Sequence, residues 1–307
     1  MKLLLSKPRG FCAGVERAIQ TVKQALSLWG SPIYVKHEIV HNKHVVAELK
    51  SLGAIFVEEL AEVPMGARVI YSAHGIPPSV REEARQRKLI EIDATCGLVT
   101  KVHSALKRYA GKGIHVFLIG HKNHVETIGT AGEAPESITI LETVEDVWAL
   151  PAFPPNASLA YLTQTTLSLD DVKEISEALR IRFPQIETLA SSSICYATTN
   201  RQMALKESMV GADLVLVVGD PNSSNSNRLR EIAEKKGIRS FLINEPGEIE
   251  SHWFEGVSLI AMTAGASTPE AIVVSCVSRL RSLGVSSIEE VVHTREDVFF
   301  QLPKQVL

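Results

Sequence analysis

Residues 2–26, KLLLSKPRGFCAGVERAIQTVKQAL, contain the pattern from which the fold can be predicted. The run KLLLS is almost continuously apolar, as in a strand that is buried on both faces of a sheet. The turn GFCAG follows, and apolar residues then recur at the three- and four-residue spacing of an amphipathic helix: Val15, Ala18, Ile19, Val22 and Leu26. The stretch therefore predicts a strand, a glycine-rich turn and a helix.

Similar strand and helix patterns alternate along the rest of the chain. Buried strands are predicted at PIYVKH, RVIYSAH, IEIDA, HVFLIG, LAYLT, DLVLVVG, SFLIN and SLIAMT. Helices are predicted over residues 98–110, 170–182, 227–236 and 269–283, and from about Thr199 onward. Strands that alternate with helices are typical of an α/β protein with parallel sheets.

A weaker regularity predicts three repeated lobes. Nine polar turns lie between strands and helices, and cysteines open the first, fourth and seventh of them, at Cys12, Cys96 and Cys195. We expect three pseudo-equivalent small α/β lobes of roughly 100 residues each. Their expected bounds are 14–96, 97–194 and 195–281, with 1–13 joining the third lobe and 282–307 forming a C-terminal tail. Since ligands bind beyond the carboxyl ends of parallel strands, the nine turns should surround one central cavity.

Composition and charge argue against several classes of protein. With a net charge of −3 and no basic block, the chain of 307 residues is not expected to bind nucleic acid. Its apolar runs are too short for a membrane span, and MKLLLSKPRG lacks the apolar region and cleavage site of a signal peptide. Four scattered cysteines without a C-x-x-C pair suit neither a disulfide scaffold nor a zinc ribbon, so a reducing, cytoplasmic location is expected.

The three turn cysteines have the surroundings of metal ligands. Each precedes a predicted helix, and a helix N-terminus favours the thiolate form, which is the form that binds metals. Three thiolates from three lobes suit an iron–sulfur cluster in which one iron lacks a protein thiolate. The alternatives are three unrelated small buried residues or a Cys₃ zinc hydrolase. Cys276 differs, because in AIVVSCVSRL it aligns with Ile272 and Leu280 on an apolar helix face, which predicts a core position.

Nine stretches, which span residues 8–268 in order, together resemble the 4-hydroxy-3-methylbut-2-enyl diphosphate reductase family of the non-mevalonate isoprenoid pathway. They are PRGFCAGVERAI, HEIVHN, SAHG, DATCGLVTKVH, GHKNHVETIGT, TQTTLS, ICYATTNRQ, SSNSNRL and TAGAST. Two positions depart from the expected pattern, since Gly97 and Val125 stand where proline is expected. Both departures alter local backbone stiffness, and neither removes a chemical group.

The resemblance implies a fold, a cofactor and a reaction. The fold is three α/β lobes around a [4Fe–4S] cluster held by Cys12, Cys96 and Cys195, with one iron that lacks a protein thiolate. The reaction is the reductive dehydroxylation of (E)-4-hydroxy-3-methylbut-2-enyl diphosphate to isopentenyl and dimethylallyl diphosphates, in which iron acts as a Lewis acid. Electrons would come from a ferredoxin or flavodoxin type donor. The runner-up interpretation is an iron–sulfur redox sensor that binds a phosphorylated metabolite.

Neutral polar residues and histidines are the candidates for substrate binding. By themselves the histidines suggest structural roles, but His41, His74 and His124 resemble the substrate-pocket histidines of the family. Because the chain has no Walker loop, the diphosphate is expected at Ser223, Ser224, Asn225 and Ser267, which precede two predicted helices. The alternative role for these residues is helix capping, and for Ser267 alone capping is the better interpretation.

Glu126 is the candidate proton donor, because it follows His124 by two residues on one of the polar turns. Thr165 in TQTT is expected to relay a proton or to bind the substrate hydroxyl. The predicted catalytic set is therefore Glu126, His124 and Thr165, and burial near anions should raise the pKa of Glu126. The alternative carboxylates are Glu16, Asp220 and Asp93, and we expect Asp93 to fix the turn before Cys96.

Overall fold

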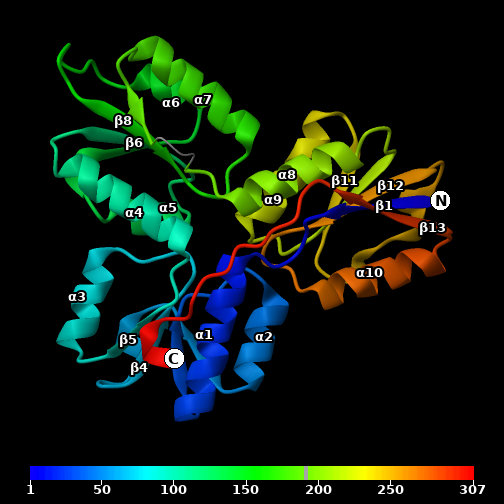
Figure 1. The fold of residues 1–307 in the computed structure, drawn as a ribbon, viewed down its shortest axis with the longest axis horizontal. Helices are drawn as coiled ribbons and strands as arrows, with labels where there is room; N and C mark the ends of the chain where they lie inside the picture. Colours follow the sequence, from blue (N-terminus) through cyan, green and yellow to red (C-terminus); the bar gives the residue numbers. More distant parts are fainter. Residues whose placement is uncertain (190–192) are drawn as a thin grey trace. The chain divides into compact units, whose positions relative to one another are not determined.

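The computed structural model describes residues 1–189 and 193–307, in which three sheets of parallel strands are connected by helices (Figure 1). The chain divides into two units. Unit 1 contains Met1–Glu16, His41–Ala47 and Tyr196–Phe299, and unit 2 contains Arg17–Val40, Glu48–Cys195 and Phe300–Leu307. The third sheet lies in unit 1 and the first two lie in unit 2. The predicted α/β class with three parallel-sheet lobes is confirmed.

The three sheets share one strand order. The first is β3-β2-β4-β5, the second is β7-β6-β8-β9, and the third is β11-β10-β12-β1-β13. If the strands of each lobe are counted in the order β2 to β5, β6 to β9, and β10, β11, β12 and β1, the order across every sheet is second, first, third, fourth. The N-terminal strand β1 serves as the fourth strand of the third sheet, where Lys2 is in register with Leu259 of β12.

The strands that make up these sheets have the following bounds. The first sheet contains β2 (Ile33–Lys36), β3 (Ala54–Val57), β4 (Arg68–Tyr71) and β5 (Ile90–Asp93). The second contains β6 (His115–Ile119), β7 (Ile138–Leu141), β8 (Leu159–Thr163) and β9 (Glu187–Thr188). The third contains β1 (Lys2–Lys7), β10 (Leu214–Val218), β11 (Arg239–Ile243), β12 (Leu259–Ala264) and β13 (Ser287–Val292).

Helices connect most of the strands. The α-helices are α1 (Ala13–Trp29), α2 (Lys43–Ser51), α3 (Pro78–Gln86), α4 (Gly97–Ala110), α5 (Val125–Ala131), α6 (Val144–Ala149), α7 (Leu169–Arg182), α8 (Tyr196–Ser208), α9 (Ser224–Lys235) and α10 (Glu270–Ser282). Single 3₁₀ turns occur at Leu60–Glu62, Pro135–Ser137, Pro246–Glu248, Ser251–Phe254 and Lys304–Val306. Among the described residues, no helix is sufficiently long and apolar to cross a membrane.

Burial on both faces explains why the central strands are almost continuously apolar. In β6, Phe117 and Ile119 pack with residues of α6 and α7, whereas Val116 and Leu118 pack with residues of α4. Helices therefore cover both faces of the second sheet (Figure 1). This is the arrangement expected for a parallel sheet.

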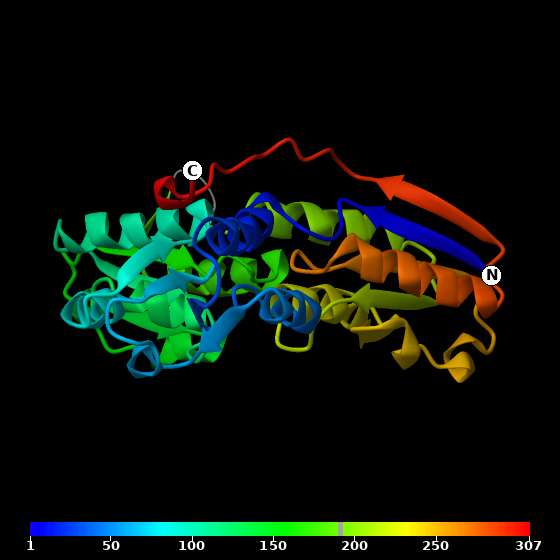
Figure 2. The same ribbon diagram turned by 90° about the horizontal axis from the view of Figure 1, so that it is seen from below.

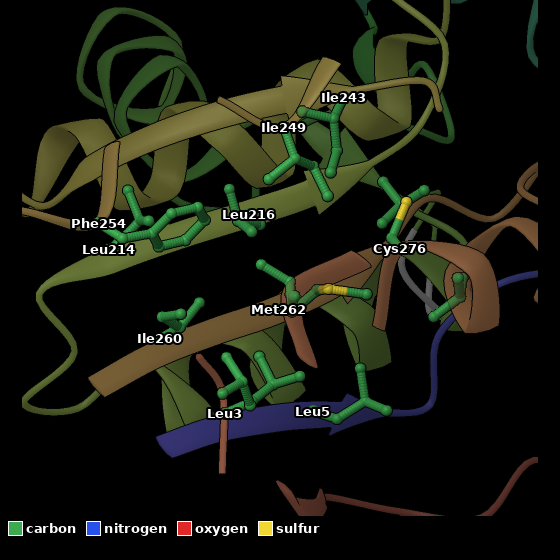
Figure 3. Close-up of a cluster of buried hydrophobic side chains, with 14 of the residues drawn as sticks. Leu3, Leu5, Leu214, Leu216, Ile243, Ile249, Phe254, Ile260, Met262 and Cys276 are labelled. Carbon is green, nitrogen blue, oxygen red and sulfur yellow. The ribbon is translucent and has the colours of Figure 1, made fainter. Parts of the chain in front are cut away.

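One of the two cores of the third sheet lies between its strands and α10, and the other lies on the side of α8 and α9. Leu3 and Leu5 of β1, Leu216 of β10 and Met262 of β12 point into the core beside α10, together with Cys276 of α10 (Figure 3). Cys276 is fully buried, and burial raises the pKa of its thiol to about 12. The predicted core position of Cys276 is confirmed.

Several short elements were not predicted. The strands β3, β7, β9 and β13 and the helices α2, α3, α5 and α6 fall in segments for which the sequence pattern predicts neither a strand nor a helix. Within the predicted tail, 282–307, β13 runs beside β1, as Figure 2 shows. In this parallel pair Lys2 is in register with Ser287. The predicted turn GHKNHVETIGT is wrong in its second half, because α5 begins there at Val125. The lobe boundaries themselves stay a prediction.

Candidate functional site

The three candidate cysteines occupy equivalent positions in the three lobes. Each directly precedes a helix, which is α1 for Cys12, α4 for Cys96 and α8 for Cys195. The main-chain N–H of each donates to a carbonyl in the turn that follows the third strand of the same sheet. The acceptors are Ala266 at 3.2 Å for Cys12, Ala73 at 2.9 Å for Cys96 and Thr165 at 3.1 Å for Cys195.

The chemistry of these cysteines fits a metal cluster better than that of Cys276. All three are partly exposed, whereas Cys276 is buried among apolar side chains. Cys12 belongs to unit 1, and Cys96 and Cys195 belong to unit 2. Within residues 1–189 and 193–307, no three His, Cys, Asp or Glu side chains form a ready-made metal site. The single cavity around three cysteines therefore stays a prediction.

Glu126 lies in a buried pair with Thr165. Glu126 is 3% exposed, and its Oε1 accepts a hydrogen bond of 2.6 Å from the main-chain N–H of Thr165. The Thr165 hydroxyl donates to Oε2 at 2.9 Å. Burial raises the pKa of Glu126 to about 7, although both bonds from Thr165 act in the opposite direction. The predicted pKa rise is confirmed, with burial as its largest cause.

The first turn of α5 places the Glu126 side chain next to Thr165. His124 is the N-cap residue, and its ring Nδ1 accepts the main-chain N–H of Glu126 at 3.2 Å. Glu126 consequently sits in the first turn of the helix rather than in an irregular loop. Val125 is the first helical residue, a position that suits proline because its N–H has no partner within the helix. A valine there in place of the expected proline keeps the helix start intact.

A turn of the first lobe packs against α5 within unit 2. The rings of His74 and His124 meet edge to face, with centroids 6.1 Å apart. The close approach depends on glycine, because a Cβ at Gly129 would lie 3.3 Å from the main chain of Gly75. Two of the three candidate histidines are therefore neighbours, and both lie near the start of the helix that carries Glu126.

The candidate diphosphate residues of unit 1 are also neighbours. Ser223 is the N-cap of α9, and Asn225 accepts the main-chain N–H of Ala266 through Oδ1 at 2.8 Å. The Ser267 hydroxyl donates to the carbonyl of His41 at 3.0 Å and lies 3.5 Å from the Ser223 hydroxyl. Ser224 is partly exposed as the first residue of α9.

Asn225 retains an unused donor. Its Nδ2 is buried and has no hydrogen-bond partner among the described residues. A buried amide donor without a partner is costly unless a ligand or water binds it. The capping interpretation of Ser267 is wrong, because the N-cap of α10 is Pro269 and the Ser267 hydroxyl is directed to His41 instead. Asn225 therefore offers one neutral donor to a ligand at this turn.

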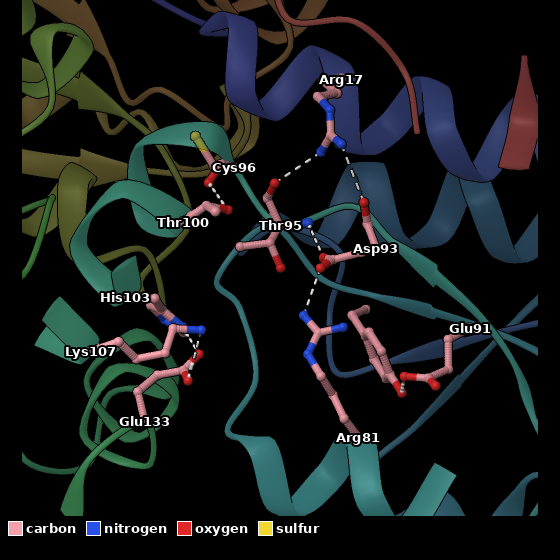
Figure 4. A network of polar contacts seen from close by, with 11 residues as sticks. Arg17, Arg81, Glu91, Asp93, Thr95, Cys96, Thr100, His103, Lys107 and Glu133 are labelled. Carbon is pink, nitrogen blue, oxygen red and sulfur yellow. Dashed lines mark hydrogen bonds and ion pairs between the residues drawn. The ribbon is translucent and has the colours of Figure 1, made fainter. Parts of the chain in front are cut away.

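The alternative carboxylates have structural roles or are exposed. Asp93 accepts the N–H of Thr95 at 2.9 Å and pairs with Arg81 at 2.6 Å, as Figure 4 shows. Burial opposes ionisation of Asp93, but the bonds from Thr95 and the charge of Arg81 outweigh it and lower the pKa. Its predicted role in fixing the turn before Cys96 is confirmed. Asp220 accepts the main-chain N–H of Lys43 at 2.9 Å, and Glu16 is exposed.

Two arginines of the motifs are not among the predicted site residues. Arg17 of PRGFCAGVERAI and Arg201 of ICYATTNRQ donate to main-chain carbonyls next to Cys96 and Cys12, respectively. Arg201 is fully buried in α8, but in the sequence it stands among other polar residues, so no local signal indicates that burial.

Comparison with known proteins gives one consistent result. Residues 3–281 match the family described as LytB protein. The chain is 66% identical to 4-hydroxy-3-methylbut-2-enyl diphosphate reductase of Protochlamydia amoebophila, over 100% of this chain and 98% of that protein. It is 62% identical to the protein of the same name from Chlamydia pneumoniae, over 99% of this chain and 98% of that protein.

Two solved structures are also similar. The first is described as the E-1-hydroxy-2-methyl-but-2-enyl-4-diphosphate reductase from Plasmodium falciparum, with a TM-score of 0.97 and 46% identity over 100% of this chain and 96% of that chain. The second is described as (E)-4-hydroxy-3-methyl-but-2-enyl diphosphate reductase, the terminal enzyme of the non-mevalonate pathway. It has a TM-score of 0.65 and 32% identity over 92% of this chain and 99% of that chain.

Proposed function

Since this chain belongs to the LytB protein family, we propose that it reductively dehydroxylates (E)-4-hydroxy-3-methylbut-2-enyl diphosphate to isopentenyl and dimethylallyl diphosphates. This is the last step of the non-mevalonate pathway. The observation that carries the proposal beyond family membership is the buried Glu126–Thr165 pair, whose carboxyl pKa of about 7 suits proton transfer near neutral pH.

The proposed cofactor is a [4Fe–4S] cluster held by Cys12, Cys96 and Cys195. Their equivalent places before three helices, and their partial exposure, support this choice over Cys276. When bound, such a cluster would supply electrons singly and one iron position without a protein thiolate. The proposed electron donor is of the ferredoxin or flavodoxin type, and the proposed location is the cytoplasm.

The proposed diphosphate contacts are the hydroxyls of Ser223, Ser224 and Ser267 and the unused Nδ2 of Asn225. In the part of the chain that the structure describes, Asn225 is 5% exposed and its Nδ2 has no protein partner, so a phosphate oxygen would satisfy it. The histidines His41, His74 and His124 would add donors that can carry positive charge. Binding by these groups holds the substrate by its anionic end.

The proposed role of Glu126 is to deliver the proton that lets the hydroxyl group leave as water. Release of hydroxide near neutral pH is unfavourable, so a donor within hydrogen-bond reach is required. With a pKa of about 7, Glu126 is protonated in a large fraction of molecules at working pH. Its bond to the Thr165 hydroxyl gives Thr165 a place as a relay, and His124 positions Glu126 from the N-cap.

Anaerobic purification tests the cofactor and the reaction together. The protein should be brown, contain about four irons and four sulfides per chain, and convert the substrate to both products when a reductant is supplied. Cys12→Ser, Cys96→Ser and Cys195→Ser should each lose the cluster, whereas the control Cys276→Ser should keep it. Stoichiometric zinc without sulfide, or loss of the cluster only in Cys276→Ser, would contradict the proposal.

A further inference from the structure

We propose that the C-terminal segment, residues 293–307, positions the main-chain loops that present Cys12 and Cys96. The segment follows β13 and is irregular up to the 3₁₀ turn at Lys304–Val306. It runs from unit 1, which ends at Phe299, into unit 2, which resumes at Phe300. Its contacts within each unit support the proposal. The proposal rests on the proposed function only in taking these cysteines as cluster ligands.

In unit 1, Arg201 holds the two residues before Cys12. Its Nε and Nη2 donate to the carbonyl of Gly10 at 3.1 and 2.8 Å, and Nη2 also donates to the carbonyl of Phe11 at 3.2 Å. The main-chain N–H of Cys12 is fixed from the other side by the carbonyl of Ala266. The loop is thus bonded at three consecutive residues.

Glu296 of the C-terminal segment compensates the charge of Arg201. The Arg201 side chain is 1% exposed, and its Nη1 donates to both carboxylate oxygens of Glu296, at 3.0 and 3.2 Å. Asn200 adds a further bond of 3.0 Å to the same carboxylate. A buried guanidinium becomes strongly unfavourable when its partner carboxylate is removed. The hydrogen bonds from Arg201 to the Cys12 loop therefore depend on the C-terminal segment. We call an arginine that binds a cysteine loop in this way a clamp.

In unit 2, Arg17 has the corresponding role before Cys96. Its Nη1 donates to the carbonyl of Thr95 at 2.9 Å and its Nη2 to the carbonyl of Asp93 at 3.3 Å, as Figure 4 shows. The third donor, Nε, binds the carbonyl of Gln301 in the C-terminal segment at 2.7 Å. The segment therefore orients this arginine as Glu296 orients Arg201.

The residue after Cys96 is also covered by the segment. A Cβ at Gly97 would lie 3.2 Å from the ring of Phe300, which is tighter than an ordinary contact. Glycine at 97, where the family resemblance leads one to expect proline, thus makes room for Phe300. The segment thus binds Arg17, which holds the backbone before Cys96, and its Phe300 lies next to Gly97 after Cys96.

In this proposal the contacts of the C-terminal segment, and not the metal, fix the conformation of the two cysteine loops. Fixing a loop before a ligand binds removes part of the ordering entropy from the binding step. Loss of the clamps should therefore loosen each cysteine loop separately and weaken retention of the cluster. A general structural role would instead loosen a whole unit.

Hydrogen exchange of the full-length, anaerobically purified protein tests this directly. Glu296→Gln should speed exchange at least about tenfold in peptides that contain Cys12, and Phe300→Ala in peptides that contain Cys96. The matched controls are the neighbouring exposed residues, in Asp297→Asn and Phe299→Ala, which should leave both loops unchanged. Peptides from α5 should exchange normally in all four variants.

Iron retention and electron-spin spectra give the second readout. Glu296→Gln and Phe300→Ala should lose iron to a chelator about tenfold faster or more than their controls, with altered spectra, and Glu296→Asp should restore retention because it keeps the charge. Should Glu296→Gln not fold, Phe300→Ala still decides the case for Cys96. Unchanged loops, or equal acceleration across a whole unit, would overturn the proposal. A wild-type protein without a cluster would refute the proposed cofactor, while the exchange pattern would still test the clamps.

Discussion

The starts of α5 and α9 occupy equivalent places in the second and third sheets and make the same hydrogen bond with different side chains. Two residues after the N-cap, Glu126 in α5 accepts the main-chain N–H of Thr165 at 2.6 Å. At the matching place in α9, Asn225 accepts the main-chain N–H of Ala266 at 2.8 Å. Each bond ties a helix to the turn after the third strand of its own sheet.

The two side chains differ in the second polar atom, the one that does not accept the main-chain N–H. Asn225 keeps an amide donor, which suits an anion, whereas Glu126 keeps a carboxylate oxygen that binds the Thr165 hydroxyl and can take a proton. The same main-chain arrangement thus carries two side chains with different chemistry. In the function that we propose, the repeat supplies the position, and the residue type at that position decides between anion binding and proton transfer.

The largest expected effect comes from Glu126→Gln. The amide keeps the size and can still accept the bond from Thr165, but it cannot deliver a proton. Turnover should fall by about 10²–10⁴, the usual range for a general acid. Substrate affinity, measured by calorimetry on the oxidised protein, should stay close to the wild-type value. A variant that turns over normally would remove the proposed difference between the two helix starts.

The same carboxyl should make stability depend on pH. Because the pKa of Glu126 is raised from 4.5 to about 7 in the folded state, its stabilising contribution is complete below pH 4.5 and is lost as pH rises through 7. The loss amounts to about 3 kcal/mol in the free energy of unfolding. Chemical denaturation of Glu126→Gln between pH 4.5 and 7 should lack this slope. The exposed-residue control Glu145→Gln should retain it.

Asn225→Ala should act on binding and leave turnover at saturating substrate nearly unchanged. It removes a neutral donor to a charged acceptor, so the dissociation constant should rise roughly ten- to a hundredfold. The same change also removes the acceptor of the Ala266 N–H. Ser223→Ala and Ser267→Ala should have effects of the same kind. Substitution of the exposed Asn222 by alanine is the control. Normal binding in all three variants would reduce these residues to structural roles.

The smallest expected effect comes from Thr165→Val. The main-chain bond to Glu126 remains, but the hydroxyl that donates to Oε2 is lost. Because that hydroxyl lowers the pKa of Glu126, its removal should raise the pKa further. Turnover should fall by roughly tenfold, the effect of one such hydrogen bond. A fall as large as that of Glu126→Gln would assign the proton transfer to Thr165.

The parts of the molecule that could be predicted from the sequence are those with a local pattern. Continuous apolar runs identified the central strands, and Cys276 was assigned to the core from its helix face. The start of α5 could not be predicted, because a helix of seven residues is stabilised by its cap and its packing more than by propensity. The pair of Arg201 and Glu296 is separated by 95 positions, so no local signal connects them.

The pH dependence of turnover, measured in parallel for the wild-type protein and Glu126→Gln, tests the central claim most directly. A general acid must be protonated to act, so the wild-type rate should be constant at low pH and fall as pH rises through about 7. The variant should be slow and should not show this fall. The same pH profile in both proteins, or a wild-type rate that does not decrease above pH 7, would contradict the assignment of the proton to Glu126.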